Sequence, residues 1–144
     1  MENFKTKGLY PGHPLRDKTL QFAIRIVRLY RYLTQQKKEF VLSRQILRSG
    51  TNPGAMVREA INAESGVDFI HKLSIAQKEA AETQYWLELL FESEFLNEPE
   101  FQSLYQDSTE IIKIIRSSIL TKKRNIAIKA SVILSLISIT LFTL

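Results

Sequence analysis

Few side chains in this 144-residue chain have the type and spacing needed for chemistry. Glu79 and Glu82 lie three residues apart, so on a helix they would share a face and could form a carboxylate pair for acid–base work. Ion pairing between helices is the commoner role of such residues. The two histidines, His13 and His71, lack the neighbouring ligands of a helical metal site. We therefore predict no catalytic residue, no metal site, no cofactor and no small-molecule substrate, and hence a protein that is not an enzyme.

Charge is distributed unevenly along the chain. Residues 15–38 carry seven Lys or Arg and one Asp, whereas residues 64–98 carry two Lys and eight acidic residues. Helices with such opposite charges could attract one another, within a subunit or between subunits. Alternatively, the positive segment could bind the phosphates of RNA or DNA, which fits a net charge of +5 and a pI near 9.5. Both interpretations remain open from the residues alone.

The candidate nucleic-acid-binding residues belong to this positive segment and the one that follows it. Three arginines lie at steps of three, a spacing that we expect to keep them on one side of a helix. Lysines after them extend the positive run. The full set of candidates is Arg25, Arg28, Arg31, Lys37, Lys38 and Arg44.

A hydrophobic seam predicts the kind of element that positions these residues. Seven side chains recur at alternating steps of four and three: Phe69, Leu73, Ala76, Ala80, Thr83, Leu87 and Leu90. This spacing is typical of one face of an α-helix, and the two central alanines allow a neighbouring helix to come close. The seam therefore indicates a protein built by helix packing.

Similar periodicity predicts four long helices with short connections. The first begins near Leu15, and the second covers about residues 39–62 with a kink at Pro53. The third runs over about residues 67–96, and the fourth starts close to Pro99. Four such helices predict an all-α fold, an antiparallel up-down four-helix bundle.

The chain divides into three parts: an irregular N-terminal arm (residues 1–14), the bundle (residues 15–125) and an apolar tail (residues 126–144) that we expect to be helical. The tail would extend about 28 Å as a helix, close to the roughly 30 Å hydrocarbon core of a membrane. The cluster Lys122, Lys123, Arg124 precedes it, as expected for the cytoplasmic side of an anchor. The arm has no apolar signal segment, so we expect a cytoplasmic protein. Membrane association through the tail and packing of the tail on protein both remain open.

Two adjoining motifs resemble a known family. They are QILRSGTNPGAMVREAINAES at 45–65 and DFIHKLSIAQKEAAETQYWLELL at 68–90. Together they resemble the signature of the bacterial four-helix-bundle family related to proteins encoded in 23S rRNA intervening sequences, over roughly residues 16–125. The resemblance implies a ring-like homopentamer. The family that the chain resembles also includes the accessory variability determinant of diversity-generating retroelements, which binds nucleic acid and works with a reverse transcriptase.

No active site comes with this resemblance. In the first motif, Ser49, Gly50, Gly54 and Ala55 are small residues expected where the helix passes close to a neighbour, and Arg48 and Glu59 are expected ion-pair partners. The expected function is a homo-oligomeric adaptor that binds RNA or DNA through the basic face of the first helix. The alternative is a protein-interaction scaffold associated with a membrane through its tail.

Overall fold

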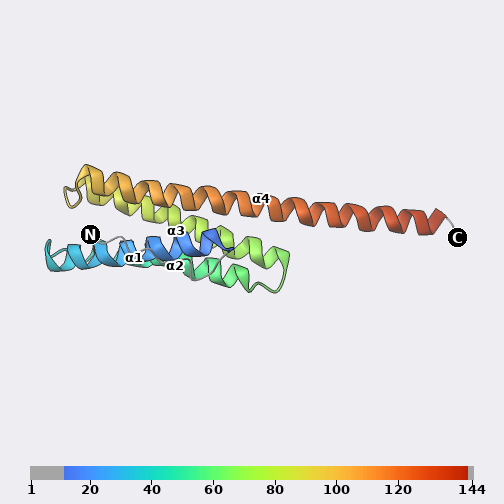
Figure 1. Ribbon diagram of the computed structural model, residues 1–144, viewed down its shortest axis with the longest axis horizontal. Coiled ribbons are helices and arrows are strands. Elements are labelled where there is room, and N and C mark those ends of the chain that lie inside the picture. The colour runs from blue at the N-terminus through green and yellow to red at the C-terminus, as the bar shows by residue number, and fades with distance from the viewer. Residues whose placement is uncertain (1–11, 143–144) are drawn as a thin grey trace.

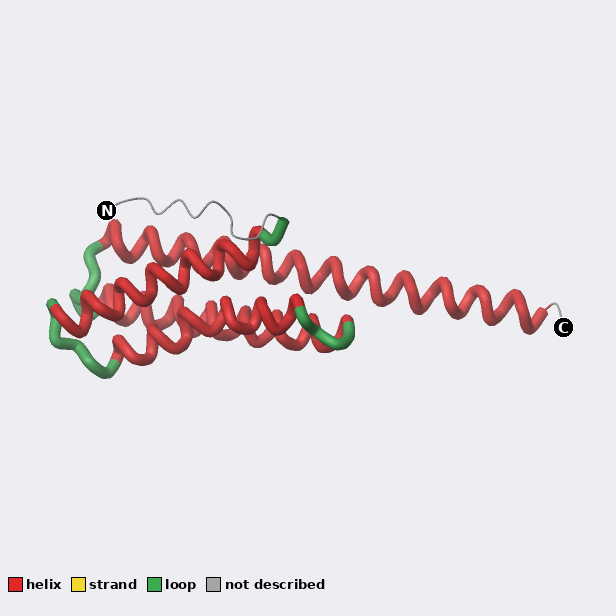
Figure 2. Tube along the Cα trace, turned by 60° about the horizontal axis from the view of Figure 1, so that its bottom comes forward, coloured by secondary structure: helices red, strands yellow, loops and turns green. Residues whose placement is uncertain are grey.

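The computed structural model describes residues 12–142, and four helices make up most of that range. They are α1 (Pro14–Gln35), α2 (Leu42–Ile61), α3 (Gly66–Glu92) and α4 (Glu98–Phe142). Each helix packs on two others, which places α1 diagonally opposite α3 and α2 diagonally opposite α4. Neighbouring helices run in opposite directions (Figures 1 and 2). The predicted antiparallel up-down bundle is therefore confirmed, while residues 1–11 of the predicted arm lie outside the described range.

The bundle has two distinct ends. The turns that join α1 to α2 and α3 to α4 lie at one end, which we call the distal end (Figure 1). The turn between α2 and α3 lies at the other end, which we call the root end. At the root end α4 continues well beyond its three partners (Figure 1). Any surface at the distal end is thus separated from the α4 extension by the length of the bundle.

The core contains the seam that predicted the fold. Phe69 is half-buried, and the other seam residues are buried: Leu73, Ala76, Ala80, Thr83, Leu87 and Leu90. Helix α2 buries the small residues Ser49, Gly50 and Gly54. A Cβ at Gly50 would meet Ile26 of α1, so the missing side chain allows α1 and α2 to pack closely. Ala55 is exposed and does not pack on another helix of its own subunit, because one residue beyond Gly54 is about 100° further round the helix.

Helix α2 runs through Pro53 without interruption, which confirms the predicted continuity and leaves the kink a prediction. The helix begins later than residue 39, because Glu39 caps it from outside. The Glu39 carboxylate accepts hydrogen bonds from the backbone N–H groups of Val41 (2.9 Å), Leu42 (2.8 Å) and Ser43 (2.6 Å). These N–H groups would otherwise lack partners at the helix start. A carboxylate at this position also interacts favourably with the helix dipole.

Replacing Glu39 by glutamine should lower the free energy of unfolding by about 1 kcal/mol, the usual worth of a helix cap. Burial alone would raise the pKa of Glu39, but the three backbone hydrogen bonds together lower it below the ordinary 4.5. The native protein therefore keeps this stabilisation above the ordinary pKa and loses it as the pH falls through the lowered pKa. Thermal unfolding of Glu39→Gln and the wild type at neutral and acidic pH measures the effect. An equal stability difference at both pH values would contradict this account.

Helix α3 ends at Glu92, four residues before the predicted end at Leu96. The backbone N–H of Phe95 donates to the carbonyl of Leu90 (2.9 Å), and that of Glu94 donates to the carbonyl of Phe91 (3.0 Å). These bonds form a Schellman motif, with Glu94 in the left-handed conformation at φ +63°. Glycine usually occupies that position, and its absence hid the helix end in the sequence.

Candidate nucleic-acid interface

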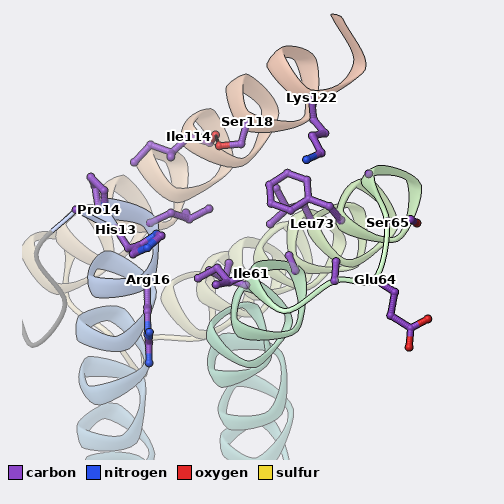
Figure 3. Close-up of a pocket in the computed structure, with 17 residues that line it drawn as sticks. His13, Pro14, Arg16, Ile61, Glu64, Ser65, Leu73, Ile114, Ser118 and Lys122 are labelled. Atoms are coloured by element: carbon purple, nitrogen blue, oxygen red, sulfur yellow. Dashed lines mark hydrogen bonds between the residues drawn. The ribbon is translucent and has the colours of Figure 1, made fainter. Parts of the chain in front are cut away.

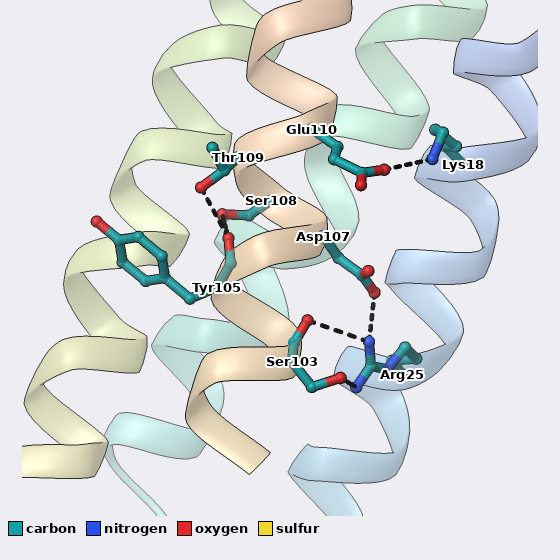
Figure 4. Close-up of polar contacts among 8 residues, drawn as sticks. All are labelled: Lys18, Arg25, Ser103, Tyr105, Asp107, Ser108, Thr109 and Glu110. Carbon is teal, nitrogen blue, oxygen red and sulfur yellow. Dashed lines mark hydrogen bonds and ion pairs between the residues drawn. The ribbon is translucent and has the colours of Figure 1, made fainter. Parts of the chain in front are cut away.

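One of the six predicted phosphate contacts, Arg25, is already engaged within the bundle. Its guanidinium pairs with Asp107 and donates to the Ser103 hydroxyl (2.8 Å), both on α4 (Figure 4). Nearby, Lys18 pairs with Glu110 (2.5 Å) and lowers the pKa of that carboxyl. Arg25 therefore belongs to the polar contacts that join α1 to α4.

The other five candidates are all exposed and cluster at the distal end. We call them the distal basic surface: Arg28, Arg31, Lys37, Lys38 and Arg44. Among residues 12–142, no acidic side chain forms an ion pair with any of them. Such cations can bind an external anion without first breaking an internal ion pair.

Local structure explains why these side chains face outward. The buried face of α1 is formed by Phe22, Ile26, Leu29 and Leu33, which leaves Arg28 and Arg31 on the exposed side. Lys38 has a left-handed backbone at φ +53° and lies in the turn after α1. The Arg44 Nε donates to the carbonyl of Phe40 (2.7 Å), which uses one of the five N–H donors of its guanidinium. Lys37 extends over the Tyr32 ring, 5.8 Å from its centroid.

Acidic residues limit the surface on one side. The turn between α3 and α4 and its flanks carry Glu92, Glu94, Glu98 and Glu100, all exposed. Glu100 lines a hollow of about 250 Å³ between α1 and α4 together with Arg28. Lys37 lines a second hollow with Glu92 and Glu94, so Arg28 and Lys37 lie at the border between the distal basic surface and these acidic residues. A polyanion should be repelled from the turn between α3 and α4.

The ion pairs of α3 join it to α2 and not to α1. Arg48 contacts Glu82 (2.5 Å) and Glu79 (3.9 Å), and Lys72 contacts Glu59 (2.7 Å). The expected pair of Arg48 with Glu59 is therefore wrong. Direct attraction between α1 and α3 within one subunit is also wrong, because the two helices lie diagonally opposite.

These contacts give Glu79 and Glu82 structural partners. Glu82 also accepts a hydrogen bond from the Trp86 indole N–H (3.1 Å). His71 is exposed on α3, as expected for a polar helix-face residue. Within the described range, no group of three or more His, Cys, Asp or Glu side chains could hold a metal ion. The carboxylate pair therefore forms the ion pairs between helices that are the commoner role of such residues.

A hollow of about 710 Å³ lies at the root end between the four helices. Its lining is mainly apolar, and its titratable residues come from separate segments: His13, Arg16, Glu64 and Lys122. Figure 3 shows the Glu64 carboxylate directed away from His13. The two side chains therefore do not form an acid–base pair.

A second group of exposed cations lies on α4, and the sequence interpretation recognised only its end, in the cluster at residues 122–124. Lys113, Arg116, Lys123 and Arg124 are exposed and lie at steps of three, seven and one. On a helix this spacing places them on one side, which periodicity could have revealed. This side lies opposite the buried face formed by Leu104, Ile111 and Ile115.

Comparisons with known proteins agree with this architecture. A family model described as 23S rRNA-intervening sequence protein matches residues 15–117. A crystal structure from Bacteroides thetaiotaomicron VPI-5482, of a protein with unknown function from the S23 ribosomal protein family, is similar at 55% identity and a TM-score of 0.72. The match covers 73% of this chain and 94% of that one. No curated protein matches the chain. Because the family model spans most of the bundle, the chain belongs to the 23S rRNA-intervening sequence protein family.

Proposed function

We propose that this protein is a non-enzymatic adaptor that binds nucleic acid through the distal basic surface. The observation that carries the proposal is the exposure of five cations from α1, α2 and their connecting turn, without ion-pair partners among residues 12–142. The names of the family and of the crystallised relative, which refer to ribosomal RNA and to a ribosomal protein family, add support. The ligand class is a phosphate backbone, because arginine and lysine side chains dominate the surface.

The expected binding is electrostatic and therefore depends on salt. Five phosphate contacts to a single strand should give a slope of about −3.5 in a plot of log affinity against log salt concentration. Between about 50 mM and 200 mM salt, the affinity should then fall roughly a hundredfold. Fluorescence anisotropy with labelled single-stranded RNA and DNA of equal sequence measures this slope. Absence of binding to either strand at about 50 mM salt would overturn the proposal.

The resemblance also supports a homo-oligomer, for which we propose a pentamer. Several copies of the distal basic surface in one ring would raise the avidity for a long strand without any new contact. The native mass of the purified protein, with and without bound RNA, measures the subunit number and the bound strand together. A monomeric mass in both samples would contradict the oligomer and leave the salt slope as a separate test of binding.

A further inference from the structure

The most unusual surface of the molecule is the end of α4, residues 126–142, which we call the α4 projection. All of its residues are exposed, and Figure 1 shows it extending away from the other three helices. Among the described helices, α4 alone is long and apolar enough to span a membrane, and none of its most apolar stretch is buried in the protein. The projection lies outside the residues matched by the family model, which end at residue 117.

The apolar residues of the projection surround the helix axis. Val132, Leu136 and Ile139 lie at steps of four and three on one side, and between 52% and 61% of their surface is exposed. A second set, Leu134, Ile137 and Leu141, lies on the roughly opposite side and is also exposed. A single partner helix would cover only one of these sides. A lipid environment contacts both, and an all-round apolar helix of this kind is typical of a membrane segment.

Three hydroxyl groups of the projection donate hydrogen bonds within the helix. The Ser135 hydroxyl donates to the carbonyl of Ser131 (2.9 Å), and the Ser138 hydroxyl donates to the carbonyl of Leu134 (3.0 Å). Thr140 donates in the same way to the carbonyl of Leu136 (3.1 Å). Hydroxyl groups bonded to their own helix avoid most of the cost of entering hydrocarbon.

Basic residues lie where the projection begins. Lys123 and Arg124 are exposed just before it, and Lys129 is its single charged residue. Lys122 extends over the Phe69 ring, 5.1 Å from its centroid, and so belongs to the root end of the bundle. Cations at one end of an apolar helix match the anionic headgroups of a bilayer. Lys129 can extend its ammonium back to that level.

We propose that the α4 projection inserts into an anionic lipid bilayer and holds the bundle upright on the membrane surface. Its 17 residues, about 25 Å as a helix, reach the lower limit of about 17 residues for spanning helices. The root end then faces the headgroups, because the first residue of the projection lies against it. A Cβ built on Gly66, at the start of α3, would be 2.9 Å from Ile126 Cδ1. The distal basic surface faces away from the membrane, at a distance of about 40 Å along the 27 residues of α3.

Vesicle flotation tests the insertion. The full chain, reconstituted by detergent removal, should float with vesicles of phosphatidylcholine containing about 30% phosphatidylglycerol. Ile137→Asp should remain at the bottom of the gradient, because a carboxylate in hydrocarbon is costly. The matched control is Val41→Asp, which changes an exposed apolar residue at the distal end and should float like the wild type. The double variant Lys123→Glu, Arg124→Glu should float less than the wild type with the anionic vesicles. With vesicles of phosphatidylcholine alone, the two proteins should float equally.

Several results would overturn this proposal. Wild-type protein that stays at the bottom with both neutral and anionic vesicles excludes a membrane anchor. Equal flotation of the wild type and Ile137→Asp would mean that a segment other than the α4 projection attaches the protein to the vesicles. If the wild type does not float, and the native mass of Ile137→Asp without lipid is lower than that of the wild type, then the α4 projection binds a second copy of the chain. None of these outcomes depends on binding of nucleic acid.

The orientation has its own test, because the chain contains no cysteine. Single-cysteine variants at Val67, beside the root end, and at Phe40, at the distal end, can each carry an environment-sensitive dye. Quenching by headgroup-labelled lipid should be strong at Val67 and absent at Phe40. Equal quenching at both positions would show that the bundle lies flat and would overturn the upright arrangement.

Discussion

Replacing both Arg28 and Arg31 by glutamate should lower the affinity for single-stranded RNA by about a hundredfold at about 50 mM salt. Each arginine lost removes a phosphate contact, and each glutamate gained adds a repulsion near the same phosphate. The salt slope should become shallower by about 1.4, since each contact to a single strand contributes about 0.7. Both side chains are exposed and outside the core, so the fold should be unaffected. Anisotropy titrations across salt concentrations give both quantities.

The matched control changes the same net charge on another helix. Lys113 and Arg116 are also exposed, and they lie on the side of α4 opposite its core face. The variant with glutamate at both positions should retain the wild-type salt slope and most of the affinity. If the two double variants lose affinity equally, only the net charge matters and no local surface exists. Arg25 is unsuitable for this test, because its replacement would break the contacts with Asp107 and Ser103.

Replacing Gly50 by alanine should destabilise the bundle by about 1–3 kcal/mol more than replacing Gly54 by alanine. A Cβ at Gly50 would lie 2.7 Å from Cγ1 and 2.9 Å from Cγ2 of Ile26, which is completely buried. At Gly54 the nearest atom, in the Arg58 side chain, would be 3.5 Å away, an ordinary contact. Both variants gain the same helix propensity, about 1 kcal/mol, so their difference reports the crowding alone.

Urea unfolding of both variants measures this difference, and a double-mutant cycle locates its cause. Gly50→Ala should cost less stability in a protein that already carries Ile26→Ala, because the crowded side chain has been removed. An equal cost in both backgrounds would mean that another neighbour opposes the new methyl group. Equal stability of Gly50→Ala and Gly54→Ala would contradict the close approach of α1 and α2.

Periodicity was sufficient to predict the helices and their buried faces, because burial follows the helix repeat directly. The seam on α3 is buried at Leu73, Leu87 and Leu90, as its spacing requires. The end of α3 was not predictable in this way. A left-handed residue stops that helix, and Glu94 adopts the conformation without the glycine that usually signals it.

The candidate site was only partly predictable from the sequence. Helical periodicity shows which residues share a face, but it does not show which other helix packs against that face. Arg25, Arg28 and Arg31 lie at steps of three, but each step turns the side chain by about 60°, so the first and last differ by about 120°. That rotation places Arg25 against α4 and leaves Arg31 exposed. The same limit applies to the ion pairs of Arg48 and Glu59, whose partners depend on how the bundle closes.

Cross-linking by ultraviolet light followed by mass spectrometry tests the central claim, binding of nucleic acid at the distal basic surface, without any substitution. The purified full chain is irradiated with single-stranded RNA at low salt, and the cross-linked peptides are identified. We expect cross-links within residues 28–44, with few or none on α4. Cross-links concentrated at residues 113–124, or no cross-links above a non-binding control protein, would contradict the claim.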